Sequence, residues 1–307
     1  MLPQVNTDEE WDAVVPDEAL VRPAAGHLCS RLGLAGAPLT RYSGGSVPVY
    51  AVGATHALKL FPTCDAAEGV VEARVLAHLQ GRLPVRTPAL HASGTFGEGW
   101  HYVLMSQLPG EDLSQVWPRI PVADRERLVT EAGEALSALH ALDPAPLADV
   151  LGPGDWNAFL ARQRTGAVER QRTRELPEGW ATRIDGFLDS VDLPTAAPGV
   201  LLHTELMRQH LVVDPRTWRL TGLFDFEPAM IGDAAYDLVA VGLFLTRGDP
   251  GLMGRFQKAY GREFDPCHLL AYALLHVYSN FTRYFRELPA PPEHTWESVA
   301  ETWFGRA

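Results

Sequence analysis

The residues with the clearest chemical potential gather in one stretch, residues 201–238. Its apolar runs predict strand, turn and strand, and polar side chains collect between the first two runs: His203, Thr204, Glu205, Arg208, Gln209 and His210. The next apolar run, Leu220 to Phe226, carries a single charge, Asp225. A carboxylate inside an apolar strand is costly unless a partner neutralises it, and a metal ion is a common partner. The stretch therefore predicts a metal-binding site built on carboxylates.

This stretch resembles the active site of the aminoglycoside phosphotransferase family, which shares the protein-kinase fold. The segments that carry the resemblance follow one another in the family's order: His203-Thr204-Glu205, His210, Phe224-Asp225-Phe226-Glu227, Gly232-Asp233 and Tyr236-Asp237-Leu238. Two central positions depart from the pattern, because Glu205 stands where the family has its catalytic Asp and His210 where it has a metal-binding Asn. Thr204 also replaces the family's Gly. The pattern is nearest to that of hygromycin-type phosphotransferases.

The resemblance implies a role for each of these side chains. Phosphoryl transfer from a nucleotide needs positioning and charge neutralisation more than covalent help from the protein. Glu205 would act as the base that faces the acceptor, and Asp225 with His210 would bind Mg²⁺ or Mn²⁺. Because Mg²⁺ prefers oxygen ligands, His210 has two alternative roles, holding a phosphate or none in catalysis. His203 and Asp237 are expected to be structural, with Asp237 paired to loop backbone amides or to His203.

Lys59 is the remaining catalytic residue that the resemblance implies. It lies in the apolar run Ala57 to Phe61, where a lysine otherwise extends its ammonium group from a sheet edge. In the family, a lysine at this position binds the α- and β-phosphates and is held by a helix carboxylate. The helix expected next offers Glu68 and Glu72. Because Asp65 can cap this helix with Glu68 at the capping-box position, we expect Glu72 to be the partner.

Two further segments are assigned to the nucleotide, ATP or GTP, by their order in the chain. The hairpin expected over residues 41–61 contains small residues that would let backbone amides approach the phosphates: Ser43, Gly44, Gly45 and Ser46. Two glycines also predict an ordinary hairpin bend. A strand at 102–105 leads to a turn at Pro109-Gly110, and in the family this segment joins the lobes. Backbone groups around Ser106 and Leu108 would then contact the adenine.

The acceptor side is expected in residues 143–198, which are least like the family, and in the last long helix. Helices are predicted at about 155–174 and 178–190, and the first carries five arginines: Arg162, Arg164, Arg170, Arg172 and Arg174. These arginines predict either a solvated face or contacts to an anionic group of the acceptor. A helix at 268–288 is either a buried core helix or a pocket wall, built from Tyr272, His276, Tyr278, Asn280, Arg283 and Tyr284.

The composition narrows the class of protein. The chain has 307 residues, 46% of them hydrophobic, and a formal net charge of −12. Such a surface disfavours nucleic acid as a partner and attracts cationic ligands, although it also serves solubility alone. No apolar run approaches the roughly 20 residues of a membrane span, and residues 1–12 lack a signal-peptide pattern. Three distant cysteines are typical of reduced thiols, so we expect a cytoplasmic protein with no membrane partner.

The pattern of elements and the resemblance predict an α+β, two-lobed protein-kinase-like fold. A small, mainly antiparallel-sheet lobe, residues 1–105, would bind the nucleotide. A mainly helical lobe, residues 106–307, would hold the catalytic residues and the acceptor. The implied function is that of a small-molecule kinase acting on a hydroxyl of an aminoglycoside-like antibiotic or metabolite, as in antibiotic resistance. The alternatives are a regulatory, nucleotide-binding pseudokinase and a kinase-fold nucleotidyltransferase.

Overall fold

The computed structural model describes residues 2–194 and 199–306 and divides the chain into two compact units. The first unit comprises Met1–Pro109 and Gly222–Pro228, and the second comprises Gly110–Thr221 and Ala229–Ala307. The predicted boundary after residue 105 falls inside a strand. The structure groups residues 106–109 and Gly222–Pro228 with the first unit. Leu223 N–H, for example, donates to the Arg86 carbonyl at 2.9 Å.

A five-stranded antiparallel sheet forms the first unit, in the order β1-β2-β3-β5-β4. Its strands are β1 (Leu39–Arg41), β2 (Val49–Val52), β3 (His56–Phe61), β4 (Leu90–Phe96) and β5 (Trp100–Ser106). The central strand β3 has a neighbour on each side, so Lys59 lies between Val49 and Val103 in the register. The sequence does not predict β4, because Gly94 and small polar residues weaken its β-propensity.

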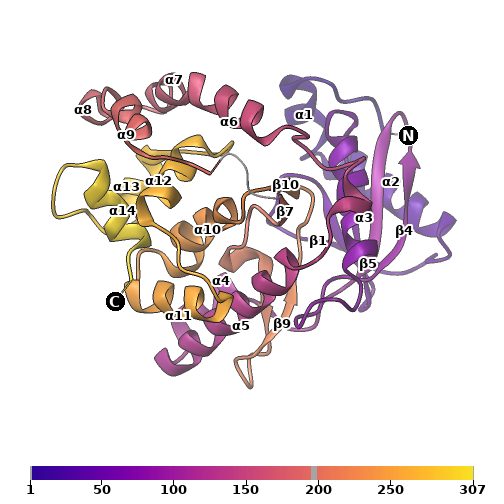
Figure 1. The fold of residues 1–307 in the computed structure, drawn as a ribbon. Coiled ribbons are helices and arrows are strands. Elements are labelled where there is room, and N and C mark those ends of the chain that lie inside the picture. The colour runs from indigo at the N-terminus through magenta and orange to yellow at the C-terminus, as the bar shows by residue number, and fades with distance from the viewer. Residues whose placement is uncertain (1, 195–198, 307) are drawn as a thin grey trace. The chain divides into compact units, whose positions relative to one another are not determined.

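Three helices complete the first unit: α1 (Asp8–Val14), α2 (Glu18–Arg31) and α3 (Ala66–Leu79). Helix α3, in the purple part of the ribbon (Figure 1), packs on β4 and β5. It turns Val75, Leu76 and Leu79 into the core, as apolar residues at helical spacing predict. Asp65 occupies its N-cap position but makes no capping hydrogen bond, so the expected capping box is wrong.

The second unit is mainly helical. Its longer helices are α5 (Val122–His140), α11 (Pro250–Tyr260), α12 (Pro266–Leu275) and α14 (Trp296–Phe304). Helix α5 packs on α11, and α12 packs on α14. Shorter helices are α4 (Leu113–Val116), α10 (Asp237–Ala240) and the π-helix η6 (Val241–Thr246). In the part of the chain that the structure describes, every helix is too short or too polar to cross a lipid bilayer.

Two small sheets and several 3-10 turns make up further elements of the chain. One sheet has the order β6-β8-β9, with β6 (Glu111–Asp112), β8 (Leu211–Val213) and β9 (Leu220–Leu223). The other pairs β7 (Val200–Leu202) with β10 (Met230–Gly232). The turns are η1 (Thr63–Asp65), η2 (Trp117–Arg119), η3 (Ala145–Leu147), η4 (Arg208–His210) and η5 (Ala234–Tyr236).

Each long helix predicted for the acceptor side is broken into two. Gly166 separates α6 (Trp156–Thr165) from α7 (Ala167–Arg172), and α8 (Glu178–Ala181) is separate from α9 (Ile184–Ser190). The predicted helix 268–288 stops at α12, and α13 (Phe281–Glu287) begins anew. His276 is extended, and the Asn280 side chain accepts the Arg283 N–H at 3.0 Å. The apolar residues keep their helical spacing through these breaks, so the spacing alone does not reveal where a helix ends and a new cap begins.

A substitution at Gly110 tests the predicted turn at Pro109-Gly110. Gly110 has φ 134°, and an added Cβ would fall onto the Val213 carbonyl and 2.7 Å from Val212 Cγ1. We expect Gly110→Ala to lower the free energy of unfolding by about 3 kcal/mol or more. Gly36→Ala is the control, since Gly36 has φ 78° with nothing near its Cβ and costs about 1–2 kcal/mol. Equal losses in denaturant unfolding would contradict the close packing of Gly110.

Candidate active site

Lys59 lies in β3 with its ammonium group buried among three carboxylates of the first unit. Its Nζ lies 3.1 Å from Oε2 of Glu72 and 2.5 Å from Oδ1 of Asp225, and it also pairs with Glu227. The side chain of Lys59 is 5% exposed and that of Glu72 is 1% exposed. The helix carboxylate that holds Lys59 is therefore supplied by the middle of α3, while Glu68 lies on the exposed side of the first turn.

The charges of this cluster do not balance. Burial acts to lower the pKa of Lys59, but the carboxylates of Glu72 and Asp225 outweigh it and raise the pKa above its ordinary value. Burial raises the pKa of Glu72, and the Lys59 ammonium offsets only part of that rise. Ligand oxygens of Glu72, Asp225 and Glu227 lie within 4.8 Å of one another. Three carboxylates around one ammonium suit a further cation, and oxygen donors suit Mg²⁺.

Asp225 reaches this cluster from a bend and not from a strand. The strand predicted over 220–226 ends at Leu223, and Asp225 has φ 74°. Short polar residues are the side chains that tolerate this left-handed conformation best after glycine. Glu227 was given no role of its own in the sequence interpretation. The available signal was a second acidic residue two positions after Asp225 in the sequence.

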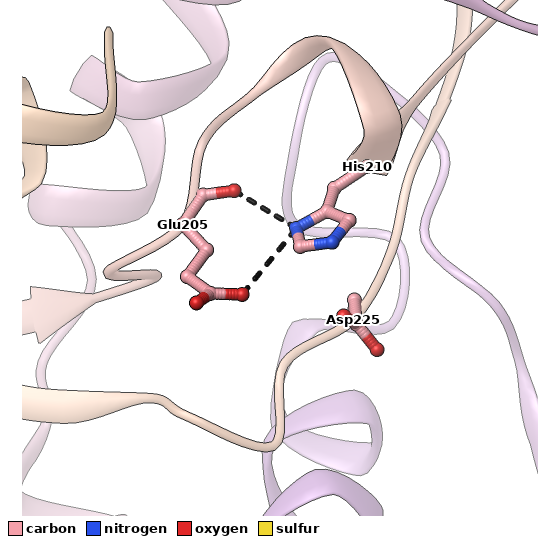
Figure 2. A group of neighbouring side chains, drawn as sticks. All are labelled: Glu205, His210 and Asp225. Carbon is pink, nitrogen blue, oxygen red and sulfur yellow. Dashed lines mark hydrogen bonds and ion pairs between the residues drawn. The ribbon is translucent and has the colours of Figure 1, made fainter. Parts of the chain in front are cut away.

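Glu205 and His210 form a closed loop in the second unit, after β7 (Figure 2). His210 Nδ1 donates to the main-chain carbonyl of Glu205 at 2.9 Å and lies 3.9 Å from its Oε2. Because a carbonyl only accepts, the proton is on Nδ1 and the lone pair of the neutral ring is on Nε2. Metal-binding histidines commonly donate their second nitrogen in this way. Leu206 is fully buried and anchors the loop.

Asp237 holds the other end of this loop. It is fully buried, and its carboxylate accepts the N–H of His203 at 2.8 Å and the N–H of Thr204. This confirms the expected pairing of Asp237 with loop amides. His140 Nε2 lies 2.9 Å from the same carboxylate and was not predicted as a partner. Thr204 has φ 68°, which is strained for a β-branched residue, so these hydrogen bonds stabilise a conformation that the family gives to glycine.

The segments assigned to the nucleotide lie in the first unit. Ser43, Gly44, Gly45 and Ser46 form an exposed loop between β1 and β2. Ser106 exchanges hydrogen bonds with Ala89 through its N–H and its Oγ, and Gln107 N–H donates to Thr55. Within the described chain, Leu108 N–H makes no hydrogen bond to the protein. In the segment predicted to contact the adenine, Ser106 to Leu108, the N–H of Leu108 is therefore the main-chain donor that does not bond the protein.

A pocket of about 290 Å³ opens beside Glu205 within the second unit. Five of the predicted pocket-wall residues line it: His276, Tyr278, Asn280, Arg283 and Tyr284. Tyr272 is fully buried in α12 and belongs to the core. The helix is interrupted between α12 and α13, and most of the wall residues lie in or after this interruption. The predicted single helix is therefore a core helix followed by a separate segment that lines the pocket.

Comparisons with known proteins agree with this geometry. The model of the phosphotransferase enzyme family matches residues 39–270. An aminoglycoside 3'-phosphotransferase of Streptomyces ribosidificus is 27% identical over 187 residues, 57% of this chain and 67% of the relative. A lysine-specific demethylase, JMJ21, of Arabidopsis thaliana is 22% identical over 202 residues, 53% of this chain. The match spans only 21% of the length of that demethylase.

Solved structures show the same fold. The GDP and kanamycin complex of an APH(2") phosphotransferase superposes with a TM-score of 0.69 at 16% identity and covers 91% of this chain and 96% of that one. The predicted α+β, two-lobed protein-kinase-like class is confirmed by this likeness. The finer resemblance to hygromycin-type enzymes stays a prediction.

Removing the Lys59 ammonium should expose the charge imbalance of its cluster. We expect Lys59→Met to lower the free energy of unfolding at pH 7 by about 3–5 kcal/mol, because buried carboxylates lose their cation. Part of the lost free energy of unfolding should return at pH 5. The pKa of Glu72 is raised from its ordinary value of 4.5, so protonation favours the folded state as pH falls through the raised pKa, with the full gain below 4.5.

Denaturant unfolding at the two pH values measures both effects. Lys258→Met is the matched control, because Lys258 is the other lysine of the chain and is exposed on α11. A loss no larger than that of the control, or a loss independent of pH, would contradict the burial of an excess of carboxylates around Lys59.

Proposed function

Because the chain belongs to the phosphotransferase enzyme family, we propose that it transfers the γ-phosphate of ATP or GTP to a hydroxyl of a small molecule. The observation that carries the proposal is Lys59 Nζ at 3.1 Å from Glu72 and 2.5 Å from Asp225. This pairing is the one that holds a phosphate-binding lysine in kinase-like sites. Relatives named for aminoglycosides and bound to GDP support a nucleotide donor and a small acceptor.

The first unit supplies the proposed nucleotide contacts. Lys59, oriented by Glu72, binds phosphate oxygens with a buried ammonium group, where Coulomb attraction is stronger than in water. The loop with Ser43, Gly44, Gly45 and Ser46 offers exposed backbone amides to the phosphates. Leu108 offers its N–H to the adenine, while the side chain of Ser106 braces β5 and makes a direct contact from that residue less favourable.

Asp225 is the proposed metal-binding residue, and the donor set around it fits Mg²⁺ or Mn²⁺. Glu227 adds a second carboxylate within the same cluster, and oxygen is the donor that Mg²⁺ prefers. The predicted role of His210 as a ligand stays a proposal, with its lone pair on Nε2. A bound divalent ion would neutralise charge on the phosphate oxygens during transfer.

Glu205 is the proposed base. Its carboxylate accepts the proton of the acceptor hydroxyl; the hydroxyl oxygen bonds to the γ-phosphorus, the bond to the bridging oxygen breaks, and a nucleoside diphosphate leaves. Glu205 is one methylene longer than the family's Asp, and a displacement of about 1 Å would cost on the order of a hundredfold in an unadapted site. The neighbouring Thr204 and His210 also depart from the family, which favours a loop remodelled as a whole.

The pseudokinase and nucleotidyltransferase alternatives gain no support from the phosphotransferases named above. A cytoplasmic location stays a prediction from the cysteine pattern. The direct test incubates the protein with γ-labelled ATP or GTP, Mg²⁺ or Mn²⁺, and a panel of aminoglycosides, nucleosides and amino alcohols. Transfer of label to an acceptor is the expected result. Tight nucleotide binding with no transfer to any acceptor would favour the pseudokinase instead.

Asp225→Asn should separate metal binding from the rest of the nucleotide site. We expect Mg²⁺-dependent nucleotide affinity and turnover to fall by about tenfold or more, because the amide lacks the charge that the metal requires. Isothermal calorimetry with and without Mg²⁺ measures the affinity. Glu68→Gln, an exposed carboxylate on α3, should leave it unchanged. Unaltered Mg²⁺-dependent binding in Asp225→Asn would refute the metal assignment.

Glu205→Gln should abolish most turnover and retain nucleotide affinity. Loss of a positioned base lowers the rate by about a hundredfold to ten-thousandfold, while the amide keeps the size of the side chain. Rates with the identified acceptor and calorimetry with the nucleotide give the two readouts. Glu263→Gln serves as control, since Glu263 is exposed and pairs with Arg306. Full turnover in Glu205→Gln would rule out Glu205 as the base.

A further inference from the structure

The pocket beside Glu205 is lined by charges of both signs. Two guanidinium groups line it, those of Arg174 and Arg283, and Glu205 is the one acidic residue among its described lining residues. His276 adds no charge at neutral pH, because burial lowers its pKa to about 4. Binding sites match the charge of their ligands. A wall with one carboxylate and two guanidinium groups lacks the several carboxylates that a polycationic acceptor requires.

Arg174 differs from its neighbours in what it contacts. Arg164 pairs with Asp189, and Arg172 pairs with Glu178 at 2.5 Å. Arg170 donates to the carbonyl of Leu274 at 3.1 Å. Arg174 donates to the carbonyl of Ser279 and, in the part of the chain that the structure describes, forms no ion pair with a carboxylate. The predicted solvated face thus describes Arg164 and Arg172, whereas Arg174 turns to the pocket.

Part of the pocket wall is apolar and aromatic. Phe244 and Tyr284 meet edge to face with centroids 5.8 Å apart. The Tyr284 hydroxyl donates to the Tyr278 carbonyl at 3.3 Å, so its ring, not its hydroxyl, is the part left for a ligand. Arg283 is neutralised by Glu287 at 2.7 Å. Arg174 is therefore the cation in this pocket that lacks an anion, and a volume of about 290 Å³ favours a small ligand.

We propose that the acceptor is a small hydroxy acid with an apolar or aromatic ring. Its carboxylate pairs with the Arg174 guanidinium, its ring packs against Phe244 and Tyr284, and its hydroxyl faces Glu205. The reverse orientation is disfavoured, because two carboxylates side by side repel. A guanidinium–carboxylate pair is a charge-assisted, often bidentate interaction with strong geometric preference. The inference rests on the proposed function, since it names the class of molecule whose hydroxyl receives the phosphate.

Three probes with one framework test the charge preference. They are 2-hydroxy-3-phenylpropanoate, its neutral amide, and the cationic 2-amino-3-phenylpropan-1-ol, with kanamycin as a polycationic reference. Calorimetry without nucleotide should find the carboxylate bound about tenfold or more tighter than the amide, with the amino alcohol weaker still. Tighter binding of either cation, or no binding of the carboxylate at millimolar concentration, would overturn the proposal.

Variants test whether Arg174 is the group that binds the carboxylate of the ligand. Arg174→Gln should reduce the carboxylate-over-amide preference to within about twofold, and Arg174→Lys should keep part of it, since lysine retains the charge without the fork geometry. Arg172→Gln, which removes a surface arginine from the same segment, should keep the full preference. An unchanged preference in Arg174→Gln would overturn the assignment, and the wild-type probe series stands even if that variant fails to fold.

A parallel assay with labelled nucleotide keeps this inference separate from the proposed function. Transfer of phosphate to kanamycin or to the amino alcohol but not to the hydroxy acid refutes the hydroxy-acid inference and retains the kinase. A pocket that selects the carboxylate while no acceptor receives phosphate retains the charge preference and refutes the kinase.

Discussion

A buried ammonium group among carboxylates constrains the whole first unit. Lys59 is 4% exposed, and leaving such a charge unpaired would cost several kcal/mol. Its partners come from distant parts of the chain, with Glu72 on α3 and both Asp225 and Glu227 after β9. The sheet, α3 and the segment after β9 must therefore meet for the charges to be tolerated. This requirement gives a physical reason why Gly222–Pro228 packs with the first unit.

In the second unit, a buried carboxylate organises the loop that carries Glu205. Asp237 accepts two consecutive loop amides and contacts His140, whose other nitrogen bonds the Tyr260 hydroxyl at 2.8 Å. These hydrogen bonds stabilise Thr204 at positive φ. They therefore fix the backbone position from which the Glu205 side chain extends. The replacement of glycine by threonine is tolerated because the strain of one residue is offset by hydrogen bonds that a buried carboxylate makes strong.

The two units differ in the charges that surround their polar sites. Three carboxylates surround Lys59, whereas two arginines and one glutamate line the pocket in the second unit. The formal net charge of −12 agrees with the excess of carboxylates around Lys59, but it does not predict the guanidinium groups in the pocket wall. Electrostatic attraction of a ligand depends on the charges within about one Debye length of it, about 8–10 Å. A composition-based expectation of a cationic ligand therefore does not extend to this pocket.

The sequence alone determined the elements whose signal is local. The spacing around Glu205, Asp225 and Asp237 carried the resemblance to the family, and the apolar run with Lys59 predicted a strand. The ends of elements needed tertiary structure: β9 stops at Leu223, and the predicted helix 268–288 breaks at a cap on Asn280. The partners of the arginines also needed it. Five arginines within residues 162–174 look alike in the sequence, and the structure gives four of them different partners: Asp189, Glu178, Leu274 and Ser279. Periodicity reports which faces are apolar, but contacts between distant segments decide which charges are neutralised and which face a ligand.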